Sequence, residues 1–288
     1  MMMKPMRRLV VDSSMLQSED LRQFLDASAS NFAVLPDFVW FELYKQESIG
    51  AIVAGMSVIG EFPEQVIVLK PGKEIAQIDP RIPNMTSSMH HSDVAHQLRE
   101  MVAILDGPDR DEPGVRTQLE RLWSGAANAL SGMLEGAHDI LLSLPEMAEQ
   151  MFTPHHLRII RKNTRYTPEM FSSIFGAADQ IWETLSGGDQ DSTRPAPKEL
   201  RTQVYLYRYS LAIVIYLLWW IQNGNQTPKR IDRARNDLID LSFAVYGTYY
   251  EGLMTADKKL DWTHQNLSLA LNALGAEVPA ARYWQSSS

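Results

Sequence analysis

The amino-acid sequence predicts an α/β protein in which the two ends of the chain form one parallel sheet and the middle adds an all-helical insertion. Residues 9–11 and 65–69 are short apolar runs rich in β-branched residues, which is typical of buried parallel strands. Between about residues 92 and 223, apolar residues recur with helical spacing and no run indicates a strand. We therefore expect residues 1–80 and 226–288 to form the α/β unit and residues 81–225 to form the insertion.

The first predicted strand ends at Asp12. Parallel α/β sheets carry their functional residues at the carboxyl ends of strands, so Asp12 is a candidate functional carboxylate. Ser13 and Ser14 follow as candidate helix caps, ahead of a helix through Leu21 and Phe24. The alternative role for Asp12 is to cap this helix, and its position alone fits both roles equally.

Two further helices are expected before the strand at residues 65–69. Pro36 and Asp37 are typical of a helix start, and the helix that follows them is almost entirely apolar apart from Glu42. A charged residue in such a helix is usually paired, metal-bound or extended toward solvent, so Glu42 is a second candidate. Apolar residues at helical spacing continue through residues 49–59. The expected order is strand, helix, helix, helix, strand.

The most apolar run of the chain lies in the middle, at residues 210–221. A membrane-spanning helix needs about 20 such residues, so we expect a buried helix of the insertion and no membrane span. Its aromatic residues would equally suit a homodimer interface. Residues 186–197 have the glycine, serine and proline content of a linker.

Carboxylates gather toward the end of the chain. Asp237 and Asp240 are three residues apart in an amphipathic helix and share part of one face. Residues 253–255 are typical of a short strand, and Asp257 and Asp261 follow its carboxyl end. Burying several carboxylates together is costly unless a cation neutralises them, so the pattern indicates a divalent metal ion with oxygen ligands.

Composition limits the classes of function. The chain has 288 residues, 45% of them hydrophobic, and is ordinary for a globular protein. The absence of cysteine excludes disulfides, thiolate zinc sites and cysteine nucleophiles. The net charge of -8 gives no overall nucleic-acid-binding signature, although it is compatible with a local basic patch. The apolar run near the start is too short for a signal peptide, so we expect a cytoplasmic protein.

Two basic clusters stand out against the acidic total. The first lies within residues 154–166, which contain no acid, and the second directly precedes Asp237. Arginine and lysine contacts to phosphates would give affinity for RNA or DNA. The first cluster fits a solvated helix face equally well, whereas the position of the second favours substrate contact. The first comprises His155, His156, Arg158, Arg161, Lys162 and Arg165, and the second Lys229, Arg230, Arg233 and Arg235.

A group of histidines follows the strand at residues 65–69. His90, His91, Asp93 and His96 contain metal-ligating side chains. Ligands on one helix are three or four residues apart, whereas His91 and His96 are five apart. We therefore expect a loop and a helix start here and no transition-metal site.

Four segments, taken in order, resemble the PIN-domain family of metal-dependent nucleases. VVDSS at residues 10–14 resembles the opening strand and aspartate of that family, and PDFVWFEL at residues 36–43 its second helix. NDLID at residues 236–240 and LMTAD at residues 253–257 resemble its third and fourth acidic motifs. The resemblance covers about residues 7–75 and 227–278 and implies a PIN-like three-layer α/β/α fold. The long helical insertion departs from an ordinary member.

The resemblance also implies an activity. It implies that Asp12, Glu42, Asp237 and Asp257 bind Mg²⁺ or Mn²⁺, with Asp261 as a further ligand or outer group. Ser13 and Thr255 would lie near the metal, and the cluster at residues 229–235 would position the substrate. The implied protein is an endonuclease, in most members an endoribonuclease, and in bacteria often a toxin or defence effector with an inhibitory protein partner. A DNA-directed nuclease and a non-catalytic interaction protein are the alternatives.

Overall fold

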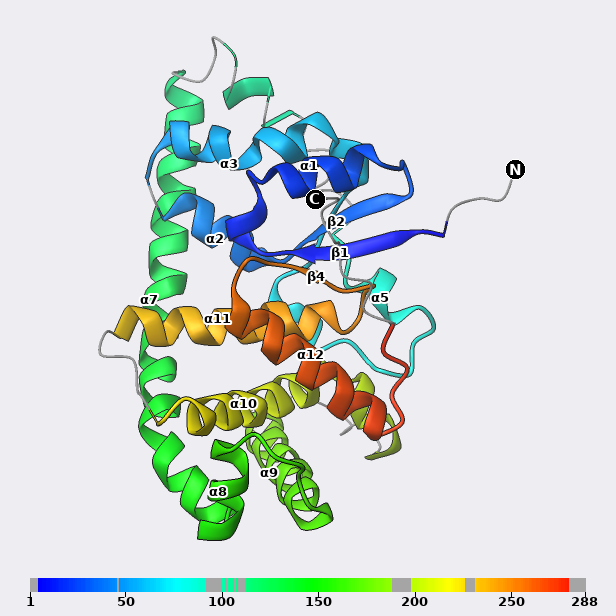
Figure 1. Ribbon diagram of the computed structural model, residues 1–288. Helices are drawn as coiled ribbons and strands as arrows, with labels where there is room; N and C mark the ends of the chain where they lie inside the picture. Colours follow the sequence, from blue (N-terminus) through cyan, green and yellow to red (C-terminus); the bar gives the residue numbers. More distant parts are fainter. Residues whose placement is uncertain are drawn as a thin grey trace.

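A parallel sheet forms the centre of the α/β part of the molecule. A computed structural model describes residues 5–45, 47–91, 100–101, 103–105, 107, 112–187, 198–225 and 231–279, without the side chains of 129–139, 141, 187, 198 and 231–234. The four strands lie in the order β3-β2-β1-β4, and all neighbouring pairs are parallel (Figure 1). Their bounds are β1 (Arg7–Val11), β2 (Asn31–Leu35), β3 (Val66–Val68) and β4 (Leu253–Met254). The chain is therefore an α/β protein, as the sequence predicts.

Strand β2 corrects the expected order of elements. Residues 31–35 are not expected to be a strand from the sequence, yet they form an inner strand in which Val34 pairs with Val10 on one side and Ile67 on the other. Apolar side chains cover both faces of this short strand, and Pro36 ends it because proline has no N–H to donate. The order strand, helix, helix, helix, strand is thus wrong, since β2 separates helix α1 (Glu19–Asp26) from α2 (Asp37–Tyr44).

Helices cover both faces of the sheet. Helices α1 and α3 (Ile49–Glu61) lie on one face, and α11 (Ile231–Gly247) and α12 (Lys258–Ala273) on the other (Figure 1). Helix α1 begins later than predicted, because Ser13–Met15 form a short 3-10 helix, η1, and Ser18 caps α1 by accepting the N–H of Leu21 at 3.1 Å. The remaining short elements are η2 (Pro63–Gln65), α4 (Gly72–Ala76) and α5 (Met85–Ser88).

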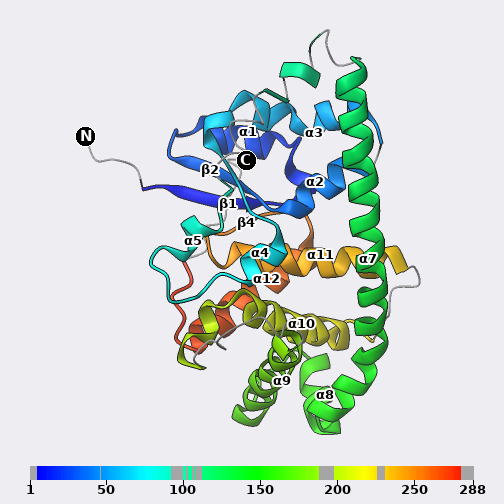
Figure 2. The same ribbon diagram turned by 180° about the vertical axis from the view of Figure 1, so that it is seen from behind.

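The middle of the chain is helical in the residues that the structure describes, and it contains no strand there. Its elements are α7 (Pro113–Met151), α8 (Pro154–Arg161), α9 (Pro168–Gly187), η4 (Lys198–Gln203) and α10 (Tyr205–Gln222). Figure 2 shows α7 running along the side of the molecule from the level of α3 to the level of α8. The predicted linker falls outside the described residues from position 188 to 197.

Helix α10 is the buried helix expected at residues 210–221. It packs against α11 and α12 on one side and against α9 on the other. No helix in the described part of the chain is long and apolar enough to cross a membrane. Side chains of α10 belong to the same hydrophobic cluster as those of the sheet. The division of the chain at residues 80 and 226 stays a prediction.

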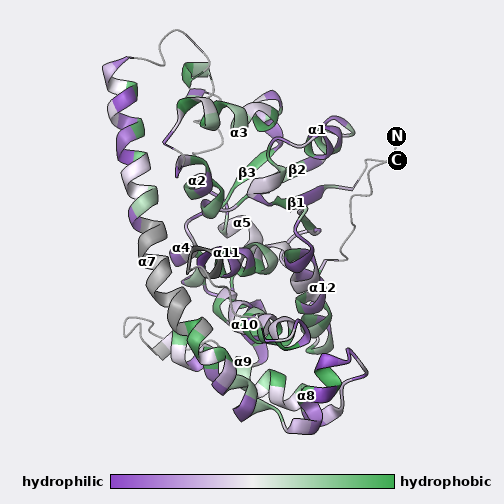
Figure 3. Ribbon diagram, turned by 60° about the vertical axis from the view of Figure 1, so that its left-hand side comes forward, coloured by the Kyte–Doolittle hydropathy of each residue, from purple (hydrophilic) through white to green (hydrophobic). Residues whose placement is uncertain are grey.

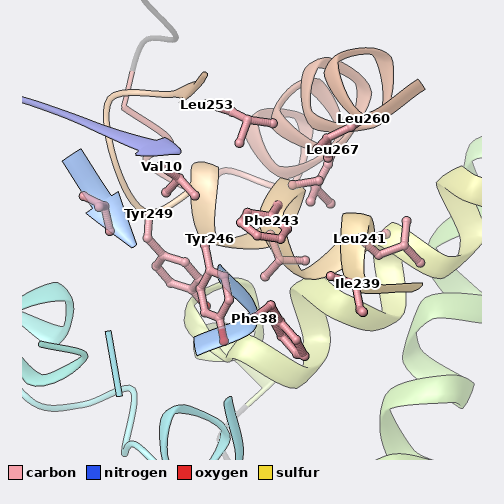
Figure 4. Packing of buried hydrophobic residues seen from close by; sticks show 14 of the residues in the cluster. Val10, Phe38, Ile239, Leu241, Phe243, Tyr246, Tyr249, Leu253, Leu260 and Leu267 are labelled. Atoms are coloured by element: carbon pink, nitrogen blue, oxygen red, sulfur yellow. The ribbon is translucent and has the colours of Figure 1, made fainter. Parts of the chain in front are cut away.

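The core that positions the sheet edge is formed by distant parts of the chain. In Figure 4, Val10 of β1, Phe38 of α2 and Phe243 of α11 pack with residues of β4 and α12. Leu253 and Leu267 are buried in this cluster. Burying such side chains stabilises the fold by roughly 1.5–3 kcal/mol each, so apolar packing holds the two ends of the chain together alongside the pairing of β1 with β4.

A buried arginine joins α10 to the end of α11. Arg208 is 4% exposed, and its Nη1 donates to the carbonyl oxygen and the hydroxyl of Thr248, both at 2.8 Å. Its Nε donates to the carbonyl of Thr202, and its guanidinium carbon lies 3.7 Å from the centre of the Tyr249 ring. Burial lowers the pKa of Arg208. These contacts satisfy the buried cation through oxygen dipoles and an aromatic face.

Candidate functional site

Asp12 follows the carboxyl end of β1 and lies among three hydroxyl groups. Asp12 is 7% exposed, and its Oδ2 accepts hydrogen bonds from Ser14 Oγ at 2.6 Å and Thr255 Oγ1 at 2.9 Å. Ser13 Oγ lies 3.4 Å from Oδ1. The side chain caps no backbone N–H of η1, so the alternative role as a helix cap is not the one that it adopts. Asp12 is instead a buried carboxylate oriented by three hydroxyls.

Strand pairing brings the end of the chain to Asp12. Because β4 is parallel to β1, with Val11 beside Met254, the residues that follow both strands emerge at the same edge of the sheet. The N–H of Asp12 donates to the carbonyl of Met254 at 3.0 Å. Thr255 therefore reaches Asp12, and Asp257 follows it. Asp257 is exposed and caps α12, with its Oδ1 accepting the N–H of Lys259 at 2.6 Å and that of Leu260 at 3.0 Å.

Helix α11 supplies two more carboxylates, as their three-residue spacing predicts. Asp237 Oδ2 accepts a hydrogen bond from the hydroxyl of Tyr216 on α10 at 2.6 Å. Asp237 Oδ1 accepts one from the ammonium of Lys259. That ammonium also lies 3.8 Å from Asp240 Oδ2 and 5.8 Å from the centre of the Tyr216 ring. Lys259, in the first turn of α12, thus bridges the two acids of α11.

Asp240 is acted on electrostatically by acids of all three segments. Burial raises the pKa of Asp240 to about 8, with further increases from the negative charges of Asp12, Asp257 and Asp237. The positive charge of Lys259 acts in the opposite direction. Asp12, Asp237 and Asp257 therefore all act electrostatically on Asp240, and the ammonium of Lys259 contacts Asp237 and Asp240. We call Asp12, Asp237, Asp240 and Asp257 the acidic cluster.

Two of the predicted acids make other contacts. Glu42 is half-buried on α2 and forms an ion pair with Lys45, one turn further along the same helix. Asp261 accepts a hydrogen bond from Gln265 at 2.8 Å, also within its own helix. Among the described residues, no side-chain hydrogen bond or ion pair joins Glu42 or Asp261 to the acidic cluster, although the backbone N–H of Asp261 donates to the carbonyl of Asp257 at 2.9 Å.

The basic cluster before Asp237 is described only in part. Lys229 and Arg230 lie outside the described residues, as does the side chain of Arg233. Arg235 is half-buried and donates to the side-chain oxygen of its neighbour Asn236 at 3.2 and 3.4 Å.

The histidine group is also described only in part, because Asp93 and His96 lie outside the described residues. His90 stacks on Tyr250 with ring centres 6.2 Å apart.

The acidic cluster fits a divalent ion in its chemistry more than in its present geometry. In this conformation, no group of three or more His, Asp or Glu side chains among the described residues is arranged to hold a metal ion. The donors are nevertheless carboxylate and hydroxyl oxygens, which Mg²⁺ and Mn²⁺ prefer. Besides burial, which is the largest cause of the raised pKa of Asp240, the negative charges of Asp12, Asp257 and Asp237 raise it and the positive charge of Lys259 lowers it, so several negative charges surround one ammonium. The residues thus fit a further cation in donor type and in charge.

Two residues of this site are not predicted by the sequence pattern. Lys259 stands two residues after Asp257 in the sequence, but a lysine in the first turn of a helix is common and gave no signal. Tyr216 lies in the middle of the most apolar run, where an aromatic residue is expected in a core. Their roles follow from the packing of α10 against α11 and α12, which no local pattern predicts.

Comparison of the chain with protein-family models, with curated proteins and with solved structures finds no match.

Proposed function

We propose that this protein is a metal-dependent endonuclease with a PIN-like fold and that its substrate is RNA, which makes it an endoribonuclease. The observation that carries the proposal is the meeting of acids from three distant segments at the carboxyl edge of a parallel sheet. Asp12 follows β1, Asp257 follows the neighbouring β4, and Asp237 and Asp240 reach them from α11. This edge is where α/β proteins bind their ligands.

Each residue has a distinct role in the proposed site. Asp12, Asp237 and Asp257 would hold Mg²⁺ or Mn²⁺, and Glu42 would join them after release from Lys45, with Asp261 in an outer position. When bound, such an ion lowers the pKa of a water molecule and stabilises negative charge on a phosphodiester. The hydroxyls of Ser14 and Thr255 orient Asp12.

Cations of the chain would position the substrate. Lys259 carries its charge beside the acids and would move toward a phosphate oxygen once a metal ion takes over the neutralisation of Asp237. Lys229, Arg230, Arg233 and Arg235 precede the same helix and would bind the phosphates of the flanking nucleotides. The role of a toxin or defence effector, with an inhibitory protein partner, belongs to the same proposal.

One observation favours a second candidate, a non-catalytic interaction protein. Lys259 neutralises Asp237, and Lys45 neutralises Glu42, so two of the four proposed ligands already have a partner within the chain. Ion pairs of this kind also occur in proteins that bind no metal. Divalent-metal binding separates the two candidates.

Cleavage of labelled single-stranded RNA and DNA tests the proposal. The protein is incubated with Mg²⁺, with Mn²⁺ or with EDTA, alongside Asp12→Asn and the matched control Asp26→Asn, whose carboxylate is exposed on α1. We expect RNA cleavage that needs the metal, is lost in Asp12→Asn and persists in Asp26→Asn.

Three other outcomes would each change the assignment. Cleavage of DNA alone would replace the endoribonuclease with a DNA-directed nuclease. Absence of cleavage of either polymer, together with no heat of Mg²⁺ or Mn²⁺ binding in calorimetry, would favour the interaction protein. Equal cleavage by wild type and Asp12→Asn would refute the role given to Asp12.

A further inference from the structure

A groove with one aromatic wall lies at the junction of α8 and α9, apart from the acidic cluster. It has a volume of about 640 Å³ and is lined by Arg165, Tyr166, Thr167, Pro168 and Phe171. The groove is open to solvent. Helices α8 and α9 lie beyond α10 when viewed from the sheet, and both views agree on this (Figures 1 and 2).

The aromatic wall is both exposed and supported. Phe171 is 44% exposed, so part of its ring is available for contact. Its ring stacks on Phe175 with centres 6.3 Å apart, and the centre of the Tyr166 ring lies 6.1 Å away in a tilted arrangement. The hydroxyl of Tyr166 accepts a hydrogen bond from Gln222 of α10 at 3.2 Å, which fixes that ring. The groove therefore presents a pre-formed aromatic surface.

Four cations surround the same junction. Arg158, Arg161 and Lys162 are spaced to share one face of α8, and Arg165 lines the groove itself. All four are exposed, and none forms an ion pair within the described part of the chain. Figure 3 shows strongly hydrophilic residues along α8. In a chain with a net charge of -8, these free positive charges form a local patch of the opposite sign.

We propose that this groove binds single-stranded nucleic acid, with an unpaired base stacked on Phe171 and the flanking phosphates on Arg165 and the cations of α8. An aromatic surface and adjacent cations are the two parts that sequence-independent single-strand binding requires. An acidic peptide would need only the cations and leaves the exposed ring without a role. A duplex keeps its bases stacked inside and offers no base to the ring.

This inference rests on the proposed function, because it supplies the single-stranded substrate with a second contact surface in the helical part of the chain. It also decides between the two interpretations of residues 154–166, a solvated helix face or a nucleic-acid contact. Binding in EDTA measures the groove without any metal-dependent cleavage. The groove and the acidic cluster are therefore tested by separate readouts.

Fluorescence anisotropy of a short labelled oligonucleotide tests the groove. The full chain is titrated in EDTA against single-stranded RNA, single-stranded DNA and duplex RNA. The variants are Phe171→Ala and Arg165→Glu. Their matched controls on α7 are Leu142→Ala, at a side chain 63% exposed, and Arg121→Glu, at an exposed arginine.

We expect tight binding of one or both single strands and weaker binding of the duplex. Phe171→Ala should weaken single-strand binding about tenfold, as loss of one stacked base does. Arg165→Glu should weaken single-strand binding further. It should also reduce the magnitude of the slope of log affinity against log salt concentration by about 0.7 or more, since each phosphate contact to a single strand contributes about 0.7 to that slope. Both controls should bind as the wild type does.

Several results would overturn the proposal. These are absence of binding to any single strand in EDTA, wild-type affinity in both groove variants, or losses of equal size in the controls. A change in the sedimentation of Phe171→Ala without a change in nucleic-acid binding would assign the groove to a contact between copies of the chain. Binding through the groove without cleavage in Mg²⁺ would support the groove and refute the nuclease, so the two failures are distinguishable.

Discussion

Replacing Asp240 with asparagine should stabilise the protein at neutral pH, because the folded chain forces this carboxyl group to hold a proton. Burial and the neighbouring acids raise the pKa of Asp240 to about 8 from an ordinary value of 3.8. Between these values the folded state binds more protons than the unfolded state, so stability falls as the pH rises through this window. Asparagine has nearly the same shape and takes up no proton.

The size of the effect follows from the pKa difference. Each unit of pKa corresponds to about 1.4 kcal/mol, so at neutral pH the protonation of Asp240 costs at most about 4 kcal/mol of folding free energy. The carboxylate is 24% exposed, and the Lys259 ammonium lies 3.8 Å away. The exposure reduces the cost, because water stabilises the ionised form, whereas the attraction of Lys259 is already contained in the pKa of about 8. We therefore expect Asp240→Asn to gain about 1–3 kcal/mol at neutral pH.

Urea unfolding in EDTA at about pH 5 and about pH 8 measures the effect. The wild type should lose stability between the two conditions through this group, and Asp240→Asn should lose less. Asp26→Asn, at an exposed carboxylate of α1, is the control and should follow the wild type. If Asp240→Asn is destabilised at neutral pH, or keeps the pH dependence of the wild type, the acidic cluster is not electrostatically strained and the reasoning fails.

Three further predictions concern the elements that hold the site. Gly247→Ala should lower the free energy of unfolding in urea by about 1–3 kcal/mol because of overpacking. An added Cβ would lie 2.8 Å from Cδ2 of His264. The control Gly125→Ala, whose added Cβ has nothing within 4 Å, should not lower it. Burial lowers the pKa of His264, so the folded state binds fewer protons than the unfolded state below about pH 6.5. The stability of the protein therefore decreases as the pH is lowered through this range. His264→Gln should remove that part of the acid sensitivity, and an unchanged slope would refute it. Glu251→Ala should lower the thermal midpoint through a loss of about 1–3 kcal/mol, because Glu251 accepts from the side chain of Arg8 at 2.7 and 3.0 Å and from its backbone N–H at 2.7 Å. An unaltered midpoint would contradict that contribution.

Local patterns predicted the elements whose signal is contained in a few consecutive residues. The strand before Asp12, the strand at residues 253–254 and the buried helix α10 were each expected from a short apolar run and its flanking residues. Strand β2 was not predicted because its apolar run continues through Pro36 into an apolar helix. The apolar residues therefore show no visible change from the two-residue period of a strand to the 3.6-residue period of a helix.

The site was predicted less completely than the strands. The position of Asp12 follows from strand polarity, and the common face of Asp237 and Asp240 follows from helical spacing. The partners of these acids do not follow from such rules. Lys259 and Tyr216 reach Asp237 only because α12 and α10 pack beside α11. The ion pair of Glu42 with Lys45 does lie at helical spacing, and it is readable in the sequence.

The hydroxyl of Tyr216 has a consequence for how this protein can be shortened. Excising the middle helices and rejoining the ends would remove the donor to Asp237 and expose the apolar faces of α11 and α12 that α10 covers. It would also strip Arg208 from Thr248 at the end of α11. A minimal version reduced to the sheet and its covering helices would therefore aggregate or misplace its acids. In evolutionary terms, the middle helices can diverge only while they preserve the surface that α11 and α12 need.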